Sequence, residues 1–222
     1  MRFIKSGNPD SGQDYLINKL NDLLKSQTVL WLISGGSNIP IEINILNSLN
    51  DNLTKKLNIL LVDERYGPSG HKDSNYHQLA SSGLNTKQAK FPDLLANDLS
   101  DIETLNLFKD TFLEFKRLSD FTVLQAGIGD DGHIAGILPF SPAINSVQPV
   151  CYYKAGGFNR LTLSLEAIKS SDLAVAFSFG QNKLRALKRL HRAHEPYESL
   201  PSLVLTEITE SRVYNDQIEE GS

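Results

Sequence analysis

The stretch FTVLQAGIGDDGHIAGILP, residues 121–139, decides the fold that we expect for this chain. It begins with a short apolar and β-branched run, Phe121–Gln125, which predicts a buried strand. The run leads into a glycine-rich turn with two aspartates and a histidine, and we expect the apolar residues after this turn to start a helix. Open α/β proteins bind ligands in loops at the carboxyl edge of the sheet, so this stretch predicts both the fold class and the place of the site.

The rest of the chain alternates strand-like and helix-like segments. Apolar runs predict further strands at residues 2–5, 28–33, 57–62, 161–165, 173–179 and 203–205. Apolar residues at helical spacing predict helices at residues 14–25, from about Pro40, and at 102–118 and 181–192. The alternation predicts a single α/β domain over residues 1–222, with a mostly parallel sheet and helices on both faces. Residues 67–92 are polar and rich in turn formers, which is typical of the border of an active site.

Composition narrows the functional classes. The chain has 222 residues, 40% of them hydrophobic, which is enough to bury one large core. Its formal net charge is −4 and its cations cluster only at residues 183–192, so we expect no nucleic-acid partner. A single cysteine, Cys151, excludes a disulfide or a cysteine-based zinc site within the chain. No window approaches the roughly 18 apolar residues of a membrane span, so we expect a soluble, cytoplasmic protein. The sequence does not indicate an oligomeric state.

The loop Ser34–Ser37 reads SGGS and lies between a predicted strand and a predicted helix. Such a loop presents backbone N–H groups and a hydroxyl at a helix N-terminus, where an anion such as phosphate is stabilised. A tight turn that merely needs glycine would have the same pattern, and the four residues alone do not decide between them. No Lys-Ser or Lys-Thr follows at the Walker spacing, which disfavours a nucleoside triphosphate at this loop.

The second glycine-rich loop, Gly127–Gly132, formally matches the dinucleotide pattern G-x-G-x-x-G. Its two carboxylates would repel a pyrophosphate, and it lies in the middle of the chain, so we disfavour a dinucleotide. His133 follows the last glycine and suits a general base, with Asp131 two residues earlier to orient it. A purely structural histidine at a helix cap is the alternative. No local spacing of histidine, aspartate or cysteine supports a metal site, and we expect no cofactor.

A third polar group, Asp63-Glu64-Arg65, follows the strand predicted at residues 57–62. It places both signs of charge in one turn at a strand end. Three charged residues in such a turn most often form an ion pair on the surface. The sequence alone does not decide between such an ion pair and a role in the site.

Five motifs in order resemble the 6-phosphogluconolactonase and glucosamine-6-phosphate deaminase superfamily, over about Val29 to Tyr214. They are Ser34-Gly35-Gly36-Ser37, Asp63-Glu64-Arg65-Tyr66-Gly67-Pro68 with Asp73-Ser74-Asn75-Tyr76, Gly127 to Ala135, Arg160-Leu161-Thr162-Leu163 and Gly180-Gln181-Asn182-Lys183. The resemblance implies a three-layer α/β/α fold with a Rossmann-like, mostly parallel sheet. It also implies a phosphosugar substrate and no redox cofactor.

Two positions separate the branches of this superfamily. The deaminase pattern has Asp-Glu-Tyr and a glutamate before the proline of the histidine motif, where this chain has Arg65 and Leu138. The lactonase pattern has Asp-Glu-Arg and an apolar residue, so the resemblance favours hydrolysis of 6-phosphogluconolactone in the oxidative pentose phosphate pathway. A deaminase or isomerase of an aminosugar phosphate, and a non-catalytic phosphosugar sensor, remain as alternatives.

The resemblance also implies roles for individual residues. His133 is then the general base, Asp131 its orienting partner, Arg65 a contact of the carbonyl oxygen or product carboxylate, and Asp63 a contact of a sugar hydroxyl. The residues that would hold the phosphate are Gly35, Gly36, Ser37, Arg160 and Lys183. The chain departs from the family pattern at Asn38-Ile39-Pro40, where Thr-Pro is usual, and at 134–138, where Thr-Ala-Ser-Leu-Phe is usual. These departures change the shape of the pocket, so a different phosphosugar is compatible with the motifs.

Overall fold

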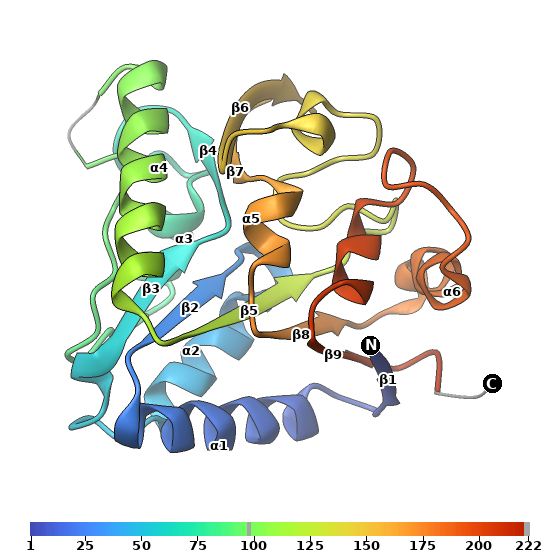
Figure 1. The fold of residues 1–222 in the computed structure, drawn as a ribbon, viewed down its shortest axis with the longest axis horizontal. Coiled ribbons are helices and arrows are strands. Elements are labelled where there is room, and N and C mark those ends of the chain that lie inside the picture. The colour runs from blue at the N-terminus through green and yellow to red at the C-terminus, as the bar shows by residue number, and fades with distance from the viewer. Residues whose placement is uncertain (97–98, 220–222) are drawn as a thin grey trace.

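A six-stranded sheet forms the centre of the molecule in the computed structural model, which describes residues 1–96 and 99–219 (Figure 1). Its strand order is β1-β9-β8-β5-β2-β3, and every neighbouring pair runs parallel. The strands are β1 (Arg2–Lys5), β2 (Val29–Ile33), β3 (Leu57–Leu61), β5 (Phe121–Gly127), β8 (Leu173–Ser178) and β9 (Glu210–Asn215). The expected parallel sheet is therefore confirmed.

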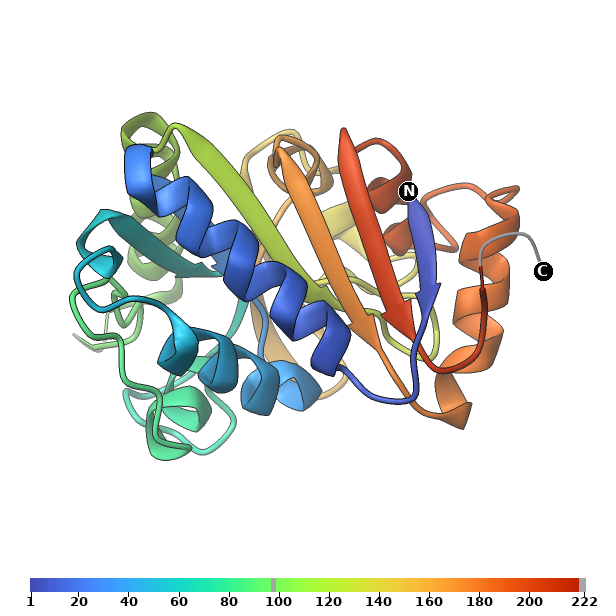
Figure 2. The ribbon, with the colours of Figure 1, turned by 90° about the horizontal axis from the view of Figure 1, so that it is seen from below.

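Helices cover both faces of this sheet, as Figure 2 shows from the side of α1 and α2. One layer contains α1 (Asp10–Ser26), α2 (Ile39–Ser48) and α3 (Asn75–Ser81), and the other α4 (Asp101–Leu118), α5 (Leu165–Lys169) and α6 (Leu184–Arg192). Alternate residues of β2 serve the two layers, because Trp31 packs in the cluster of α1 and α2 whereas Leu30 and Leu32 pack in the cluster of α4 to α6. All five residues of β2 are buried. The three-layer α/β/α arrangement is thus confirmed.

A second, separate sheet is antiparallel and has the order β4-β7-β6; its strand β4 follows β3 along the chain. Its strands are β4 (Asp63–Tyr66), β6 (Val150–Ala155) and β7 (Phe158–Leu163). One residue, Val62, separates β3 from β4; its N–H donates to Ile33 and its carbonyl accepts from Leu163. The turn between β6 and β7 is Gly156-Gly157, and both glycines have positive φ, as a two-residue hairpin requires.

The structure corrects two of the expected strands. Residues 203–205 belong to a 3₁₀ helix, η5 (Pro201–Thr206), and the last strand of the sheet is the more polar β9. Pro201 favours the first turn of a helix, whereas alternation of buried and half-buried residues supports β9. The strand expected at residues 161–165 is β7, which begins three residues earlier and stops before Ser164 caps α5.

The prediction of a helix directly after His133 is also wrong. The next helical turn is η3 (Pro142–Asn145), and the backbone before it forms bridges between Ile134 and both Ile128 and Ile137. The Tyr153 hydroxyl donates to the carbonyl of Gly136 and accepts from the N–H of Leu138. The polar backbone groups of this segment are therefore satisfied without a helix.

Short 3₁₀ segments complete the elements near the site: η1 (Gly36–Asn38) precedes α2, and η4 (Gln181–Lys183) precedes α6. Another, η2 (Thr54–Lys56), leads into β3. Within residues 1–96 and 99–219, every helix is too short or too polar to cross a membrane.

Candidate active site

A pocket of about 220 Å³ lies where β2 and β5 end and where β4 and β7 meet the main sheet. It is lined by Ser34, Gly35, Gly36, Ser37, Asn38, Asp63, Arg65, Asn75, Gly127, Ile128, Gly129, His133, Ala135, Arg160 and Lys183. Residues from five separated motifs thus come together in one place. Of the residues that the sequence assigned to the site, Asp131 is the one outside this lining. It reaches the site through its contact with the His133 ring.

The loop after β2 brings a helix N-terminus to the pocket. Gly36 has φ +65°, a conformation that costs glycine little, and η1 and α2 follow directly. Asn38 is the N-cap residue of α2, but its side-chain amide donates to Ser34 Oγ, 3.1 Å away, instead of capping the helix. The N–H groups of a first helical turn have no intrahelical partner, so this terminus is suited to an anion.

The N-cap residue of α6, Lys183, also lines the pocket, and its side chain does not cap the helix. By contrast, serines cap α3, α4 and α5, which begin outside the pocket or at its border: Ser74, Ser100 and Ser164. Helix α1 follows Pro9, which has no capping side chain. Two uncapped helix N-termini and the Lys183 ammonium therefore converge on the pocket, and all three favour negative charge.

A buried carboxyl group supports the Ser34 loop from beneath. Glu42 on α2 has 0% exposure, and its Oε1 accepts from the N–H of Ser34 at 2.9 Å. Burial raises the pKa of Glu42 well above its ordinary value, although the bonds from Ser34 oppose this shift. A raised pKa disfavours the charged form of this carboxyl, which holds the backbone of Ser34 in place beneath the loop.

Two arginines face each other on the opposite wall. Arg65 of β4 and Arg160 of β7 are direct partners in the antiparallel ladder, and both guanidinium groups lie over the ring of Phe158, at 5.4 and 5.7 Å. Like charges directly opposite each other destabilise a ladder unless an anion lies between them. Together with Lys183, these arginines make the pocket strongly cationic.

Asp63 lies beside the arginines and is 6% exposed. Burial raises its pKa, and the charges of Arg65, Arg160 and His133 oppose the shift. A carboxyl group at this point is a suitable hydrogen-bond partner for a sugar hydroxyl.

The surface ion pair considered for residues 63–65 is not found in the described residues. Glu64 is 1% exposed and accepts from Ser74 Oγ and from the N–H groups of Arg65, Asn75 and Tyr76, at 2.6 to 3.0 Å. These bonds hold the start of α3 against β4. They place Asn75 in the pocket, where its Nδ2 donates to the carbonyl of Asp63 at 2.9 Å.

Asn75 and Asn38 are pocket residues that sequence reasoning did not assign. Asn75 belongs to the Asp73-Ser74-Asn75-Tyr76 motif and to the polar border at residues 67–92, so its position carried a signal. Asn38 stands where the family pattern has threonine, and its role in holding Ser34 depends on a contact that the sequence does not reveal.

The histidine and its aspartate form a defined pair. Asp131 Oδ1 lies 2.7 Å from His133 Nδ1 and also accepts from the His133 N–H at 2.9 Å. The side-chain hydrogen bond to His133 is the main cause that lowers the pKa of Asp131 to about 2. An ionised carboxylate only accepts hydrogen bonds, so Nδ1 is the donor. A neutral His133 therefore carries its free lone pair on Nε2.

Close packing and hydrogen bonds hold this pair in place. A methyl group on Gly129 would lie 2.1 Å from His133 Nδ1, so only glycine allows the imidazole to lie there. The Gly129 N–H donates to the carbonyl of His133, and Arg189 Nη1 donates to the carbonyl of Asp131, both at 2.9 Å. The ring orientation is thus set by its surroundings before any ligand binds.

Cation ligands are sparse in the part of the chain that the structure describes. Within it, no three side chains of histidine, cysteine, aspartate or glutamate are grouped so that they could hold a metal ion. The pocket offers instead a cationic end with backbone N–H groups, and an imidazole with a free lone pair. This arrangement can hold a phosphorylated polar molecule and remove a proton next to it.

Sequence comparison finds relatives that are named 6-phosphogluconolactonases. The chain is 24% identical to a probable 6-phosphogluconolactonase of Dictyostelium discoideum over 180 residues, 76% of each protein. It is 24% identical to a 6-phosphogluconolactonase of Synechocystis sp. over 157 residues, which are 67% of this chain and 65% of that protein.

Structural comparison finds the same fold in both branches of the superfamily. A 6-phosphogluconolactonase from Shewanella baltica superposes with a TM-score of 0.79 at 21% identity over 97% of each chain. A monomeric glucosamine-6-phosphate deaminase superposes with a TM-score of 0.76 at 16% identity over 97% of each chain. At these identities the likeness concerns the fold alone.

The family assignment comes from a match over nearly the whole chain. Residues 9–214 match the sequence model of glucosamine-6-phosphate isomerases and 6-phosphogluconolactonases. This range includes every residue that lines the pocket. The chain therefore belongs to the glucosamine-6-phosphate isomerase/6-phosphogluconolactonase family.

Proposed function

We propose that this protein hydrolyses 6-phosphogluconolactone to 6-phosphogluconate, with His133 as general base. The observation that carries the proposal is that one pocket contains His133, which is held by Asp131, together with groups suited to an anion: Arg160, Lys183 and the 35–37 loop. A phosphorylated lactone has a phosphate at one end and an activated ester at the other. The pocket offers matching groups to both ends.

At the ester end, His133 Nε2 takes a proton from a water molecule as that water attacks the lactone carbonyl carbon. The resulting oxyanion is stabilised by the positive charge of Arg65. The bond between the carbonyl carbon and the ring oxygen then breaks, and the imidazolium returns the proton to the ring oxygen. Asp131 stabilises the imidazolium and keeps Nδ1 protonated throughout.

At the other end, the phosphate binds to the N–H groups of Gly36 and Ser37 and to Arg160 and Lys183. Asp63 accepts a hydrogen bond from a sugar hydroxyl. None of these contacts acts on the ester, so their binding energy positions the reacting carbonyl at His133.

The lactonase is favoured over the deaminase at two positions. Arg65 lines the pocket where the deaminase pattern has tyrosine, and Leu138 provides an apolar side chain where that pattern has glutamate. The deaminase would lack a carboxylate of its proton relay. The fold does not distinguish a lactonase from a deaminase, because proteins named for each activity occur among the structural relatives.

The test uses freshly made 6-phosphogluconolactone, with spontaneous hydrolysis subtracted, and glucosamine 6-phosphate assayed in parallel for ammonia. We expect lactone hydrolysis alone, and a loss of about 10²-fold or more in kcat for His133→Ala, with binding of 6-phosphogluconate retained. Ammonia release would assign the protein to the deaminase branch. Binding of phosphosugars without either activity would make it a sensor.

We further propose that residues 1–222 form one cytoplasmic domain that needs no cofactor. Both apolar clusters pack on the same sheet, which supports one folding unit. A single cooperative unfolding transition, unchanged by a chelator, is the expected result, and two separate transitions would contradict the single domain.

A further inference from the structure

A second, larger cavity lies on the other side of the histidine loop. It has a volume of about 1000 Å³ and shares no lining residue with the candidate active site. One wall is formed by α6, and the other includes Asp130, Asp131 and the segment Pro139-Phe140. We call this cavity the α6 groove. Apart from Asp131, which orients His133, its lining residues have no part in the hydrolysis mechanism.

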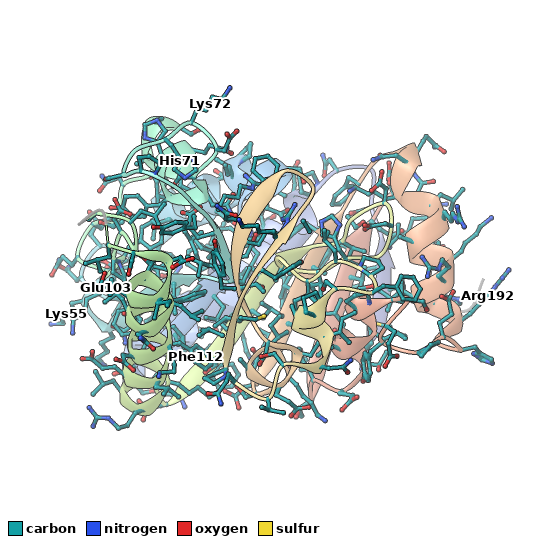
Figure 3. The ribbon with its side chains drawn as sticks, turned by 90° about the horizontal axis from the view of Figure 1, so that it is seen from above. Lys55, His71, Lys72, Glu103, Phe112 and Arg192 are labelled. Atoms are coloured by element: carbon teal, nitrogen blue, oxygen red, sulfur yellow. The ribbon has the colours of Figure 1, made fainter. Side chains whose placement is uncertain are left out.

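The α6 wall of the groove is cationic. Arg185, Lys188 and Arg192 are exposed, line the groove and recur three and four residues apart, so they lie on one face of the helix. Figure 3 shows Arg192 extending away from α6 at the edge of the molecule. In the described chain, the head groups of these three residues form neither a hydrogen bond nor an ion pair. At 1.5 Å per residue, they span about 10 Å along the helix axis.

The neighbouring ion pair leaves Lys188 and Arg192 uncompensated, although Glu195 also interacts electrostatically with Arg185. Glu195 lies in the groove, but both of its carboxylate oxygens bind Arg189, at 2.8 and 2.6 Å. The pKa of Glu195 is lowered to about 2, first because of this bond to Arg189. Asp130 and Asp131 place two carboxylates on the opposite wall, so the surplus of positive charge lies along the α6 wall. It is this wall that is complementary to an anion.

The opposite wall presents an aromatic ring. Phe140 is 78% exposed, and its φ of +58° is a conformation that costs energy for a residue with a bulky side chain. Its N–H donates to the carbonyl of Glu198 at 2.6 Å, which fixes the backbone at the rim of the groove. With Pro139 and Leu184, the ring gives the groove an apolar part beside its cations.

We propose that the α6 groove binds a nucleoside polyphosphate, with the phosphates on Arg185, Lys188 and Arg192 and the base stacked on Phe140. An anion with several charges matches cations spread over about 10 Å, and a flat aromatic base matches the exposed ring. The cavity also has the size of a typical small-ligand site. The missing Walker pattern does not bear on this site, because side chains and not a backbone loop would hold the phosphates.

The groove is connected to the candidate catalytic pair. Arg189 lines the groove and binds both Glu195 and the carbonyl of Asp131. A bound polyphosphate would lie beside this link, so we expect it to alter the rate at His133. The binding itself does not depend on the proposed lactonase activity.

The test is a calorimetric titration of the full chain with ATP, tripolyphosphate and adenosine. ATP should bind one to one, more tightly than tripolyphosphate and much more tightly than adenosine, and its affinity should fall as salt is added. Arg185→Gln combined with Lys188→Gln should weaken ATP by about 10-fold or more. Phe140→Ala should weaken ATP by about 5-fold or more and leave tripolyphosphate unchanged. Ala keeps the same backbone constraint as Phe, and the site is exposed, so folding should be preserved.

Arg117→Gln is the matched control, since Arg117 is exposed on α4, which lies at the opposite end of the molecule from α6 in Figures 1 and 2. Absence of saturable ATP binding would overturn the proposal. Displacement of ATP by 6-phosphogluconate would instead make the groove part of the sugar site. Tighter binding of a polyglutamate peptide, insensitive to Phe140→Ala, would reassign the groove to an acidic protein partner. His133→Ala should still bind ATP, so a failure of the hydrolase assignment is told apart from a failure here.

Discussion

Arg65 and Arg160 are direct partners across the β4–β7 ladder, and both guanidinium groups lie over the ring of Phe158. Without an anion between them, their charges repel. Arg160→Gln should therefore raise KM for the lactone by about 10-fold or more, since a charge-assisted bond to the phosphate is lost, while kcat changes less. The thermal midpoint of the ligand-free protein should stay equal or rise. A loss of kcat at unchanged KM would place Arg160 at the ester instead.

Gly129 tests how closely the imidazole must be placed. In Gly129→Ala the new methyl group would lie 2.1 Å from His133 Nδ1, so the ring must move. A displacement of about 1 Å at a catalytic group can cost about 10²-fold in rate, and we expect a loss of kcat of that size. Gly7→Ala is the matched control, because nothing lies within 4 Å of a methyl group at Gly7. Equal kcat in the two variants, measured with the lactone assay, would show that the ring position is not critical.

Asp131→Asn tests the tautomer of His133. An asparagine amide can donate to Nδ1, which would put the imidazole proton on Nε2 and remove the base. We expect kcat to fall by about 10²–10⁴-fold with KM nearly unchanged, whereas Asp130→Asn, one residue away, should keep the wild-type rate. If both variants lose activity equally, the loop rather than the tautomer is responsible.

The same aspartate gives a prediction for acid stability. The pKa of Asp131 is lowered from its ordinary 3.8 to about 2, so the unfolded chain binds its proton first as the pH falls. Its contribution to stability is present above pH 3.8 and is lost as the pH falls toward 2. Urea unfolding of the wild type and Asp131→Asn should show the two stabilities converging over this window. A constant difference between them would contradict the assigned shift.

The contribution of Glu42 to stability should change with pH in the opposite direction to that of Asp131. Because burial raises its pKa in the folded protein, the native state holds a proton that the unfolded state loses above its ordinary pKa of 4.5. This term therefore weakens the wild type as the pH rises above 4.5, by up to about 1.4 kcal/mol per pH unit. Glu42→Gln keeps the acceptor for the Ser34 N–H and cannot ionise. Its stability relative to the wild type should improve between pH 5 and pH 8 in urea unfolding, and a parallel pH dependence would show that Glu42 is ionised when folded.

The sequence predicted the elements whose pattern is local. The buried run of β2 is apolar throughout, and β1, β5 and the helices α1, α4 and α6 have regular spacing, so their positions were predicted within a few residues. Strand β9 was missed because polar residues alternate with its buried ones. Strand β4 looks like a turn in the sequence because it is charged, and the partners that allow Glu64 to be buried include Ser74 and Asn75, ten and eleven residues along the chain.

The candidate site could be predicted as a set of loops but not as a geometry. The five motifs contain every residue that lines the pocket except Asn38, because each motif lies next to a strand end or a helix start. The pairing of Arg65 with Arg160 depends on the antiparallel register of β4 and β7, and the buried Glu42 under Ser34 depends on packing between α2 and β2. Neither relationship leaves a pattern in a single sequence.

Val62 is the one residue between the two sheets, and it is bonded to both: its N–H binds β2 through Ile33, and its carbonyl binds β7 through Leu163. Main-chain hydrogen bonds at Val62 therefore fix the second sheet, which carries the two arginines, relative to the loops of the main sheet. Exchanging side chains changes the lining of the pocket but leaves this main-chain connection between the two sheets in place. Changing the distance between the sheets would require inserting or deleting residues at the junction itself.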